Sequence, residues 1–201
     1  MLLRFGRLRL RISFFFTAFL VLILAADVPE KPAVFFLSAL LHEAGHLVCL
    51  LASGCRDLTL SLMPGGAAIS GGTIGGLPLK NALIAVLAGP CVNLLLACAL
   101  RVAARAGVTV PMDAVPVNLA LGLGNLLPLS FLDGGRALSL LLTAAGRASF
   151  LLRGQKKLDF LLIVLLFLAA SAAAVIGQNS PFLWGFVVYC LCRTVTSRRR
   201  G

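Results

Sequence analysis

Long apolar segments separated by short basic clusters are the feature that most limits how this chain can fold. Of its 201 residues, 60% are hydrophobic and 12% are charged, whereas an ordinary soluble domain is about half apolar and about a quarter charged. A soluble domain of this size has no core large enough to bury that much apolar surface, so we expect lipid to cover the rest. The sequence therefore predicts a membrane protein whose main surroundings are a lipid bilayer.

Six apolar segments are candidate membrane spans, because about 20 apolar residues suffice for a helix to cross the bilayer. We expect an all-α, polytopic fold with about six transmembrane helices, forming a single domain over residues 1–201. The fourth segment is rich in helix-breaking residues, the sixth is short, and the first also fits a signal peptide. The segments cover residues 12–26, 32–53, 79–100, 114–132, 158–176 and 181–192.

The loop after the second span predicts a short, membrane-associated β segment. Residues 58–62, Leu-Thr-Leu-Ser-Leu, alternate apolar and polar side chains with the period of a strand. Glycine pairs follow at 65–66, 71–72 and 75–76, which indicate a loop. A lone strand needs a pairing partner, and an extended substrate could supply one by strand addition. A solvated cytoplasmic loop is an equal alternative.

Positive charge is divided among the ends of the apolar segments. The formal net charge is +11, but the basic residues form no single stripe, so no nucleic-acid partner is expected. Placing the N-terminus in the cytoplasm puts the largest basic clusters on the cytoplasmic side, as the positive-inside rule requires. These clusters are Arg4 to Arg11, Arg153 to Lys157 and Arg198 to Arg200. Both termini of this multi-pass protein are therefore expected to be cytoplasmic.

One motif in the second span is typical of metal chemistry. His42-Glu43-Ala44-Gly45-His46 matches HExxH, which places the two imidazoles one helical turn apart on the same face. Both can then bind one zinc ion, with the glutamate beside them as the base for a water molecule. Ionisable groups inside an apolar span are costly unless they are paired or metal-bound, and these are the chain's 2 histidines. The alternative is a buried polar cluster that links helices.

A third ligand is required, because a catalytic zinc ion usually takes three protein ligands and a water molecule. Of the 7 acidic residues, most fall in loops or beside lysines, and Asp133 remains, at the end of the fourth apolar segment. Pro128 interrupts that segment, and Gly134 and Gly135 permit a sharp turn after it. Irregular backbone at membrane depth is tolerated where it is buried or lines a wet cavity. The alternative for Asp133 is a helix cap or an ion pair with Arg136.

Together these motifs resemble the site-2 proteases, a family of intramembrane zinc metalloproteases. HEAGH is followed by residues 125–135, Asn-Leu-Leu-Pro-Leu-Ser-Phe-Leu-Asp-Gly-Gly, and residues 88–93, Ala-Gly-Pro-Cys-Val-Asn, are similar to a recurring AGPxxN motif of the family. The eight-residue step from Asn125 to Asp133 and the layout of the spans are most similar to the stage IV sporulation protein FB branch. A second proline found in many relatives is replaced here by Ser130-Phe131, which could soften the local turn.

The resemblance implies one zinc ion per chain, bound by His42, His46 and Asp133, with Glu43 as the catalytic base. It implies that Asn125 binds the substrate backbone or the oxyanion. Asn93, Pro128 and Gly134 are interpreted as structural residues, with Asn93 forming hydrogen bonds between helices. No PDZ or CBS domain is expected within the 201 residues.

The resemblance also implies a membrane-associated protein substrate. A pro-sigma factor processed in sporulation is one candidate, and an anti-sigma factor in stress signalling is another. An inhibitory membrane partner is allowed, and the oligomeric state stays open. The expected location is the bacterial cell membrane, with the active site nearer the cytoplasmic face and roughly 10–17 Å below it. Two non-catalytic alternatives are a metal transporter and an inactive metal-binding scaffold.

Overall fold

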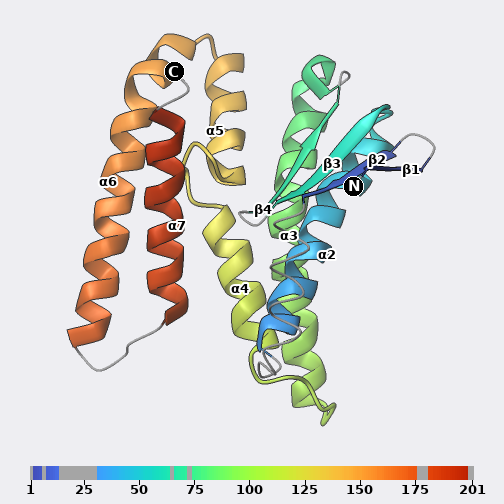
Figure 1. Cartoon of the computed structure of the whole chain (residues 1–201), viewed down its shortest axis with the longest axis vertical. Helices are drawn as coiled ribbons and strands as arrows, with labels where there is room; N and C mark the ends of the chain where they lie inside the picture. The colour runs from blue at the N-terminus through green and yellow to red at the C-terminus, as the bar shows by residue number, and fades with distance from the viewer. Residues whose placement is uncertain are drawn as a thin grey trace. The chain divides into compact units, whose positions relative to one another are not determined.

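The structure, a computed structural model, describes residues 2–5, 8–13, 31–63, 66–71, 74–175 and 181–198 (Figure 1). The chain divides into two compact units, Met1–Leu127 and Pro128–Gly201. The first unit combines a small sheet with helices, and the described part of the second unit is helical.

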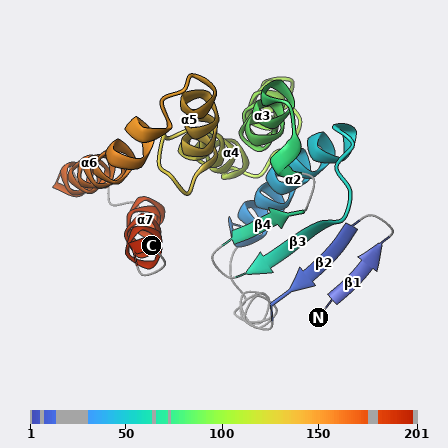
Figure 2. The same cartoon turned by 90° about the horizontal axis from the view of Figure 1, so that it is seen from above.

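The first unit contains a four-stranded sheet with the strand order β1-β2-β3-β4 (Figure 2). β2 pairs with β3 in parallel, and the two outer pairs are antiparallel. The strands are β1 (Leu2–Phe5), β2 (Leu8–Ile12), β3 (Leu58–Met63) and β4 (Gly66–Ser70).

The sheet confirms the predicted strand at residues 58–62 and corrects the expectation of an all-α fold. β3 is not a lone strand, because β2 and β4 of the same chain pair with its two sides. The arginine-rich segment at the N-terminus was interpreted as the flank of a span, yet residues 8–12, Leu-Arg-Leu-Arg-Ile, alternate with the period of a strand. Arg9 and Asp57 also form an exposed ion pair, 3.6 Å apart. The expected span at residues 12–26 lies outside the described residues beyond Ser13.

Three helices pack against one another in the first unit: α2 (Lys31–Ala52), α3 (Leu79–Arg105) and α4 (Ala114–Asn125). A short 3-10 helix, η1 (Ile74–Gly76), precedes α3. Small residues let the helices approach closely. A Cβ on Gly45 of α2 would lie 3.0 Å from the Ala88 carbonyl oxygen of α3, and one on Gly122 of α4 would lie 2.8 Å from the Leu94 side chain.

An apolar cluster joins the sheet to the ends of α2 and α3. Its buried members are Leu50, Cys55, Leu58 and Ala85, with Ile69 and Leu77 packed against them. Leu58 is fully buried although it opens β3. The sheet is thereby fixed to the C-terminal end of the helix that carries the HExxH motif.

The second unit contains α5 (Asp133–Ala144), α6 (Ala148–Val175) and α7 (Pro181–Arg198). Gly146 has φ +70° and lies in the turn between α5 and α6, a conformation that glycine adopts without steric cost. α6 packs against both of its neighbours. Phe167 of α6 meets Trp184 of α7 edge to face, with ring centroids 5.7 Å apart.

Three helices among the described residues are long and apolar enough to cross a membrane, namely Ala33–Ala52, Leu79–Arg105 and Gly154–Val175. They coincide with the predicted second, third and fifth spans. The expected count of about six is not supported, because α4 has 12 residues and extends only about 18 Å, and α7 is not among the three. The stretch predicted at 114–132 ends as a helix at Asn125 and continues as a turn.

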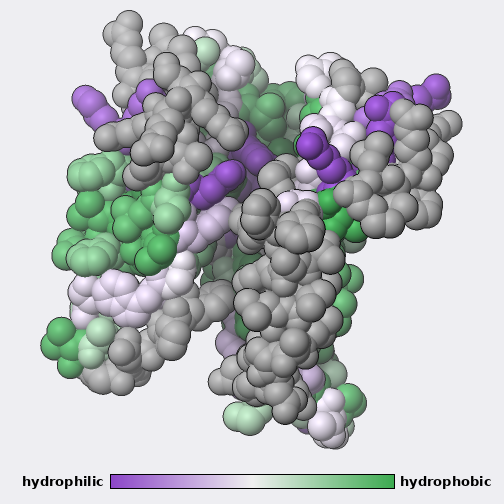
Figure 3. All heavy atoms as spheres, in the orientation of Figure 1, coloured by the Kyte–Doolittle hydropathy of each residue, from purple (hydrophilic) through white to green (hydrophobic). Residues whose placement is uncertain are grey.

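The distribution of polarity on these helices supports a membrane protein. Large apolar side chains such as Val48, Leu95 and Phe160 are more than half exposed, and hydrophobic side chains gather over α6 on the face drawn in Figure 3. Several polar side chains are instead buried, among them Ser38, His42, His46, Asn93, Asn118, Asp133 and Asp159. Apolar residues outside and polar residues inside suit a bilayer as solvent.

Candidate metal centre

The HExxH motif lies within α2, as predicted, and it directs its two histidines into the interior. His42 and His46 are one turn apart, and both are buried. Their Nε2 atoms face each other at 3.1 Å, and the rings meet edge to face. Glu43 lies beside them on α2 and is half-buried.

The opposite nitrogen of each ring faces an oxygen atom. The Nδ1 atom of His42 is 2.5 Å from Oδ1 of Asn93, and the Nδ1 atom of His46 is 2.7 Å from the Ala85 carbonyl oxygen. Both oxygens are acceptors, so each Nδ1 carries a proton and donates it. In the neutral rings, each Nε2 atom therefore presents a lone pair.

A buried network sets the direction of the Asn93 amide. Its Nδ2 atom donates to the Ser38 carbonyl oxygen at 3.2 Å and to Oδ1 of Asn118 at 2.7 Å. The Asn118 amide is oriented in turn by donating to the Ser38 hydroxyl and the Ala114 carbonyl oxygen. With both Nδ2 hydrogens of Asn93 directed at acceptors, its Oδ1 atom is the group that faces His42.

The two Nε2 atoms suit a shared cation. Two lone pairs cannot hydrogen-bond to each other, so a proton or a metal ion is needed to make their close approach favourable. Nitrogen ligands about 2.0–2.1 Å from a tetrahedral zinc ion lie roughly 3.3–3.4 Å apart, which is close to the 3.1 Å seen here. Oxygen acceptors on the second ring nitrogen are the usual support for metal-binding histidines. The imidazole pair therefore fits zinc.

Gly89 of α3 leaves space at this edge of the rings. A Cβ at Gly89 would lie 2.6 Å from Nε2 of His42 and closer still to Nε2 of His46. Any larger residue would occupy the position next to both lone pairs. The glycine of the AGPxxN motif is thus required by the site itself.

Asp133 is the first residue of α5 and is buried. A carboxylate is favourable at a helix N-terminus, where the backbone N–H groups point outwards. One of its oxygens is 3.6 Å from the Arg136 guanidinium, whose side chain is mostly exposed. The alternative interpretation of Asp133 as an ion-pair partner of Arg136 is therefore also met.

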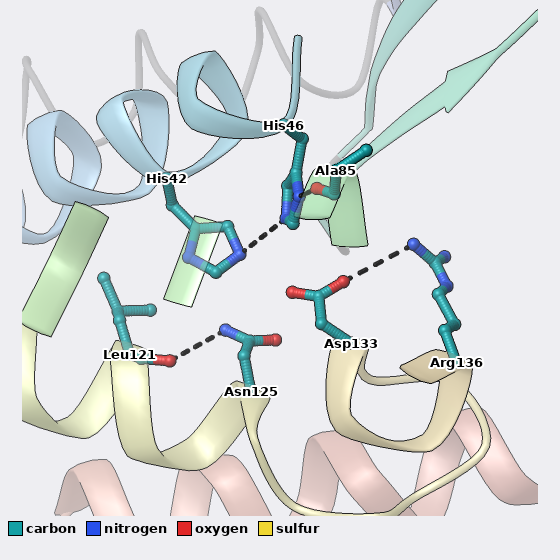
Figure 4. Close-up of polar contacts among 7 residues, drawn as sticks. All are labelled: His42, His46, Ala85, Leu121, Asn125, Asp133 and Arg136. Atoms are coloured by element: carbon teal, nitrogen blue, oxygen red, sulfur yellow. Dashed lines mark hydrogen bonds and ion pairs between the residues drawn. The ribbon is translucent and has the colours of Figure 1, made fainter. Parts of the chain in front are cut away.

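The described residues contain one group of three side chains that could hold a metal ion. His42 and His46 in the first unit and Asp133 in the second each offer one ligand atom, and all three residues are buried (Figure 4). Two imidazoles and a carboxylate match the donor set of a catalytic zinc site that keeps its fourth position open.

The turn before Asp133 differs from the one expected. Gly134 and Gly135 were predicted to permit a sharp turn after Asp133, but both lie inside α5, and the turn occupies residues 126–132. Pro128 lies in that turn, consistent with its predicted role as a helix breaker. Gly135 is the glycine that this turn needs, because a Cβ there would collide with the Leu129 backbone.

Asn125 is the last residue of α4 and is half-buried. Its Nδ2 atom donates to the Leu121 carbonyl oxygen at 2.9 Å, as Figure 4 shows. An amide nitrogen carries two hydrogens, so this bond does not exhaust its donor capacity. Its assignment to the substrate or the oxyanion stays a prediction.

Sequence reasoning missed the residues that support the histidines. Neither Asn118 nor Ser38 was singled out, although Ser38 lies one turn before His42. Asn93 was interpreted as a link between helices, and the structure adds its contact with the His42 ring. The signal that could have identified all three is a polar side chain inside an apolar segment.

No protein-family model matches the chain, and no curated protein sequence matches it either. Its fold is similar to that of the site-2 protease from Methanocaldococcus jannaschii, with a TM-score of 0.63 over 94% of this chain and 91% of that one. The two sequences are 21% identical over this region. The comparison shows that the chain shares the fold of a site-2 protease.

Proposed function

We propose that this chain is an intramembrane zinc metalloprotease, which hydrolyses a peptide bond in or near the membrane segment of a regulatory protein. The buried histidine pair supports this proposal most directly, because both Nδ1 atoms donate to oxygen and both Nε2 atoms face the same space. Asp133 completes a group that could hold the metal ion. The fold shared with a site-2 protease agrees with the assignment.

Each polar residue would have a distinct part in the reaction. Zinc held by His42, His46 and Asp133 would lower the pKa of a water molecule and polarise a peptide carbonyl. Glu43 would accept the proton of that water and then deliver it to the departing amine. The Asn125 amide would donate to the carbonyl oxygen of the substrate as negative charge develops there.

The test compares wild type with Glu43→Gln for both zinc content and cleavage. We expect one zinc ion per chain in both proteins, and cleavage by wild type alone, because the glutamine retains the shape but cannot accept a proton. Zinc in both proteins without cleavage by either would favour the inactive scaffold. Equal cleavage by both at equal expression would remove Glu43 from the mechanism.

For the substrate, we propose a regulator tethered to the membrane near its cytoplasmic face. A pro-sigma factor is the first candidate, as in the stage IV sporulation protein FB branch that the sequence resembles, and an anti-sigma factor is the second. Co-expression of each candidate from the same genome with wild type and Glu43→Gln distinguishes them by immunoblot. In the described sheet, an extended peptide could pair only with an edge strand, β1 or β4, since β3 has partners on both sides.

The proposed membrane arrangement places both termini in the cytoplasm. The basic clusters at both ends of the sequence support this orientation. Reporter fusions at the two termini of the full chain test it, and an extracellular terminus would contradict it.

A further inference from the structure

Asp159 is a buried carboxylate near the start of the long apolar part of α6. It lies in α6, and its residue is 6% exposed, whereas its neighbour Phe160 is 63% exposed. An ionised carboxylate is costly to bury unless several donors satisfy it. The residue takes no part in the mechanism proposed above, so its burial requires another reason.

The hydrogen bonds to the Asp159 carboxylate connect α6 to the loop of residues 128–132 in the same unit. Oδ1 accepts the backbone N–H of Ser130 at 2.9 Å, and Oδ2 accepts the Ser130 hydroxyl at 2.6 Å. Gln155, one turn earlier on α6, donates to Oδ1 of Asp159 and to the Pro128 carbonyl oxygen, each at 3.2 Å. Asp159 and Gln155 thus hydrogen-bond to two residues of the loop 128–132, namely Ser130 and Pro128.

This loop leads directly into the helix that begins with Asp133. The Leu132 N–H donates to the Leu129 carbonyl oxygen at 2.9 Å, and the Arg136 N–H donates to the Leu132 carbonyl oxygen at 3.0 Å. Leu129 and Leu132 are both buried, and Gly135 packs against the Leu129 backbone. A displacement of Ser130 would therefore move the first turn of α5 and the carboxylate on it.

We propose that Asp159 is a positioning residue that, together with Ser130 and Gln155, holds residues 128–132 in the shape that presents Asp133 to the metal ion. The proposal rests on the proposed function in so far as Asp133 is taken as a zinc ligand. It also accounts for Ser130, which the sequence analysis expected to soften the turn. The Ser130 backbone N–H and hydroxyl instead supply two of the bonds that fix the loop.

The experiment uses full-length protein in detergent, stripped of metal and titrated with Co²⁺, whose visible absorption reports the number and geometry of its ligands. Zinc affinity is then measured by competition. Asp159→Ala removes all acceptors, and Asp159→Asn is the conservative variant, because its Oδ1 atom still accepts and its Nδ2 atom can donate to the Ser130 hydroxyl. Ser130→Ala removes one donor and Ser130→Thr removes none. Ser171→Ala is the matched control, since Ser171 bonds only to its own helix at Phe167.

For wild type we expect one equivalent of Co²⁺ with a four-coordinate spectrum. Asp159→Ala should shift the spectrum at saturation towards that of Asp133→Ala and weaken zinc binding by about tenfold or more. Asp159→Asn, Ser130→Thr and Ser171→Ala should behave like wild type, with Ser130→Ala in between. The serine and asparagine variants keep the test decisive if Asp159→Ala does not fold.

Two other results have separate meanings. A wild-type spectrum and affinity in every variant, with only a lower melting temperature for Asp159→Ala, would show that the contacts stabilise the helices and do not position the ligand. Failure of the wild-type protein to bind Co²⁺ or Zn²⁺ would overturn the proposed function, and this inference with it.

Discussion

At His42 and His46, the oxygen that faces each Nδ1 atom decides the chemistry of the opposite ring edge. Asn93 and the Ala85 carbonyl oxygen are both acceptors, so the lone pairs are directed to the side where the rings meet. An unmodified HExxH motif on a helix does not guarantee this outcome, since a donor at either Nδ1 atom would favour the other tautomer. The partners of the histidines matter as much as their spacing.

Removing the Asn93 amide should weaken metal binding without removing a ligand. Asn93→Ala leaves the His42 Nδ1 atom without its oxygen acceptor, and we expect zinc affinity to fall roughly 10- to 100-fold. Asn93→Asp keeps an acceptor at that point and should lose less. Asn118→Ala, which removes one acceptor of the Asn93 amide, should have an intermediate effect. Unchanged affinity in Asn93→Ala, measured by chelator competition, would contradict this role.

A methyl group at Gly89 should abolish stoichiometric zinc binding. The added Cβ would lie 2.6 Å from Nε2 of His42, so at least one imidazole must turn away from the other. Gly185→Ala is the matched control, because it also lies within a helix and a Cβ there meets nothing within 4 Å. Zinc content of the purified proteins is the measurement, and equal zinc in both variants would show that the rings can move apart without loss of the site.

At the scale of elements, the N-terminus of α5 depends on one close backbone approach. Gly135 lies against the Leu129 backbone, and a Cβ there would also come within 2.9 Å of the Ser130 nitrogen. The neighbouring atoms belong to the backbone, which cannot rotate away as a flexible side chain can. Gly135→Ala must therefore displace the loop or the helix.

We expect Gly135→Ala to lower the melting temperature and the zinc content together. Gly75→Ala, where a Cβ meets open space, should leave both unchanged. Thermal unfolding and metal analysis of the two variants provide the measurement. A normal zinc content in Gly135→Ala would mean that Asp133 keeps its place after the loop has moved.

Helices and strands with a clear hydrophobic periodicity were predictable from the sequence, and features decided by tertiary contacts were not. The helix around HEAGH, the apolar runs of α3 and α6, and β3 follow from periodicity and length. The strand β2 was missed because its arginines were interpreted as markers of membrane orientation, although they alternate with apolar residues. Asp159 was set aside because Lys156 and Lys157 are near it in sequence, whereas its partner Ser130 is 29 residues away. Such pairs are formed by folding and leave no local pattern.

At the scale of the whole molecule, large apolar side chains are exposed while several polar side chains are buried among the described residues. Exposed apolar side chains line the long helices, and buried polar residues form hydrogen bonds within each unit. A soluble enzyme buries apolar residues to remain folded. With a bilayer over the exposed apolar surface, the interior can hold hydrogen-bonded polar side chains beside its apolar residues.

The parallel pairing of β2 with β3 also constrains how the chain is threaded. β3 begins six residues after α2 ends, so the sheet lies on the membrane side at which α2 finishes. β2, which ends at Ile12, belongs to the same sheet. If α2 crosses the bilayer, the N-terminal end of α2 lies on the opposite side of the membrane from Ile12. Single cysteines introduced at Arg11 and Ala33 in a cysteine-free background should therefore be labelled from opposite faces of the membrane. Labelling from one face would mean that α2 enters and leaves the bilayer on the same side.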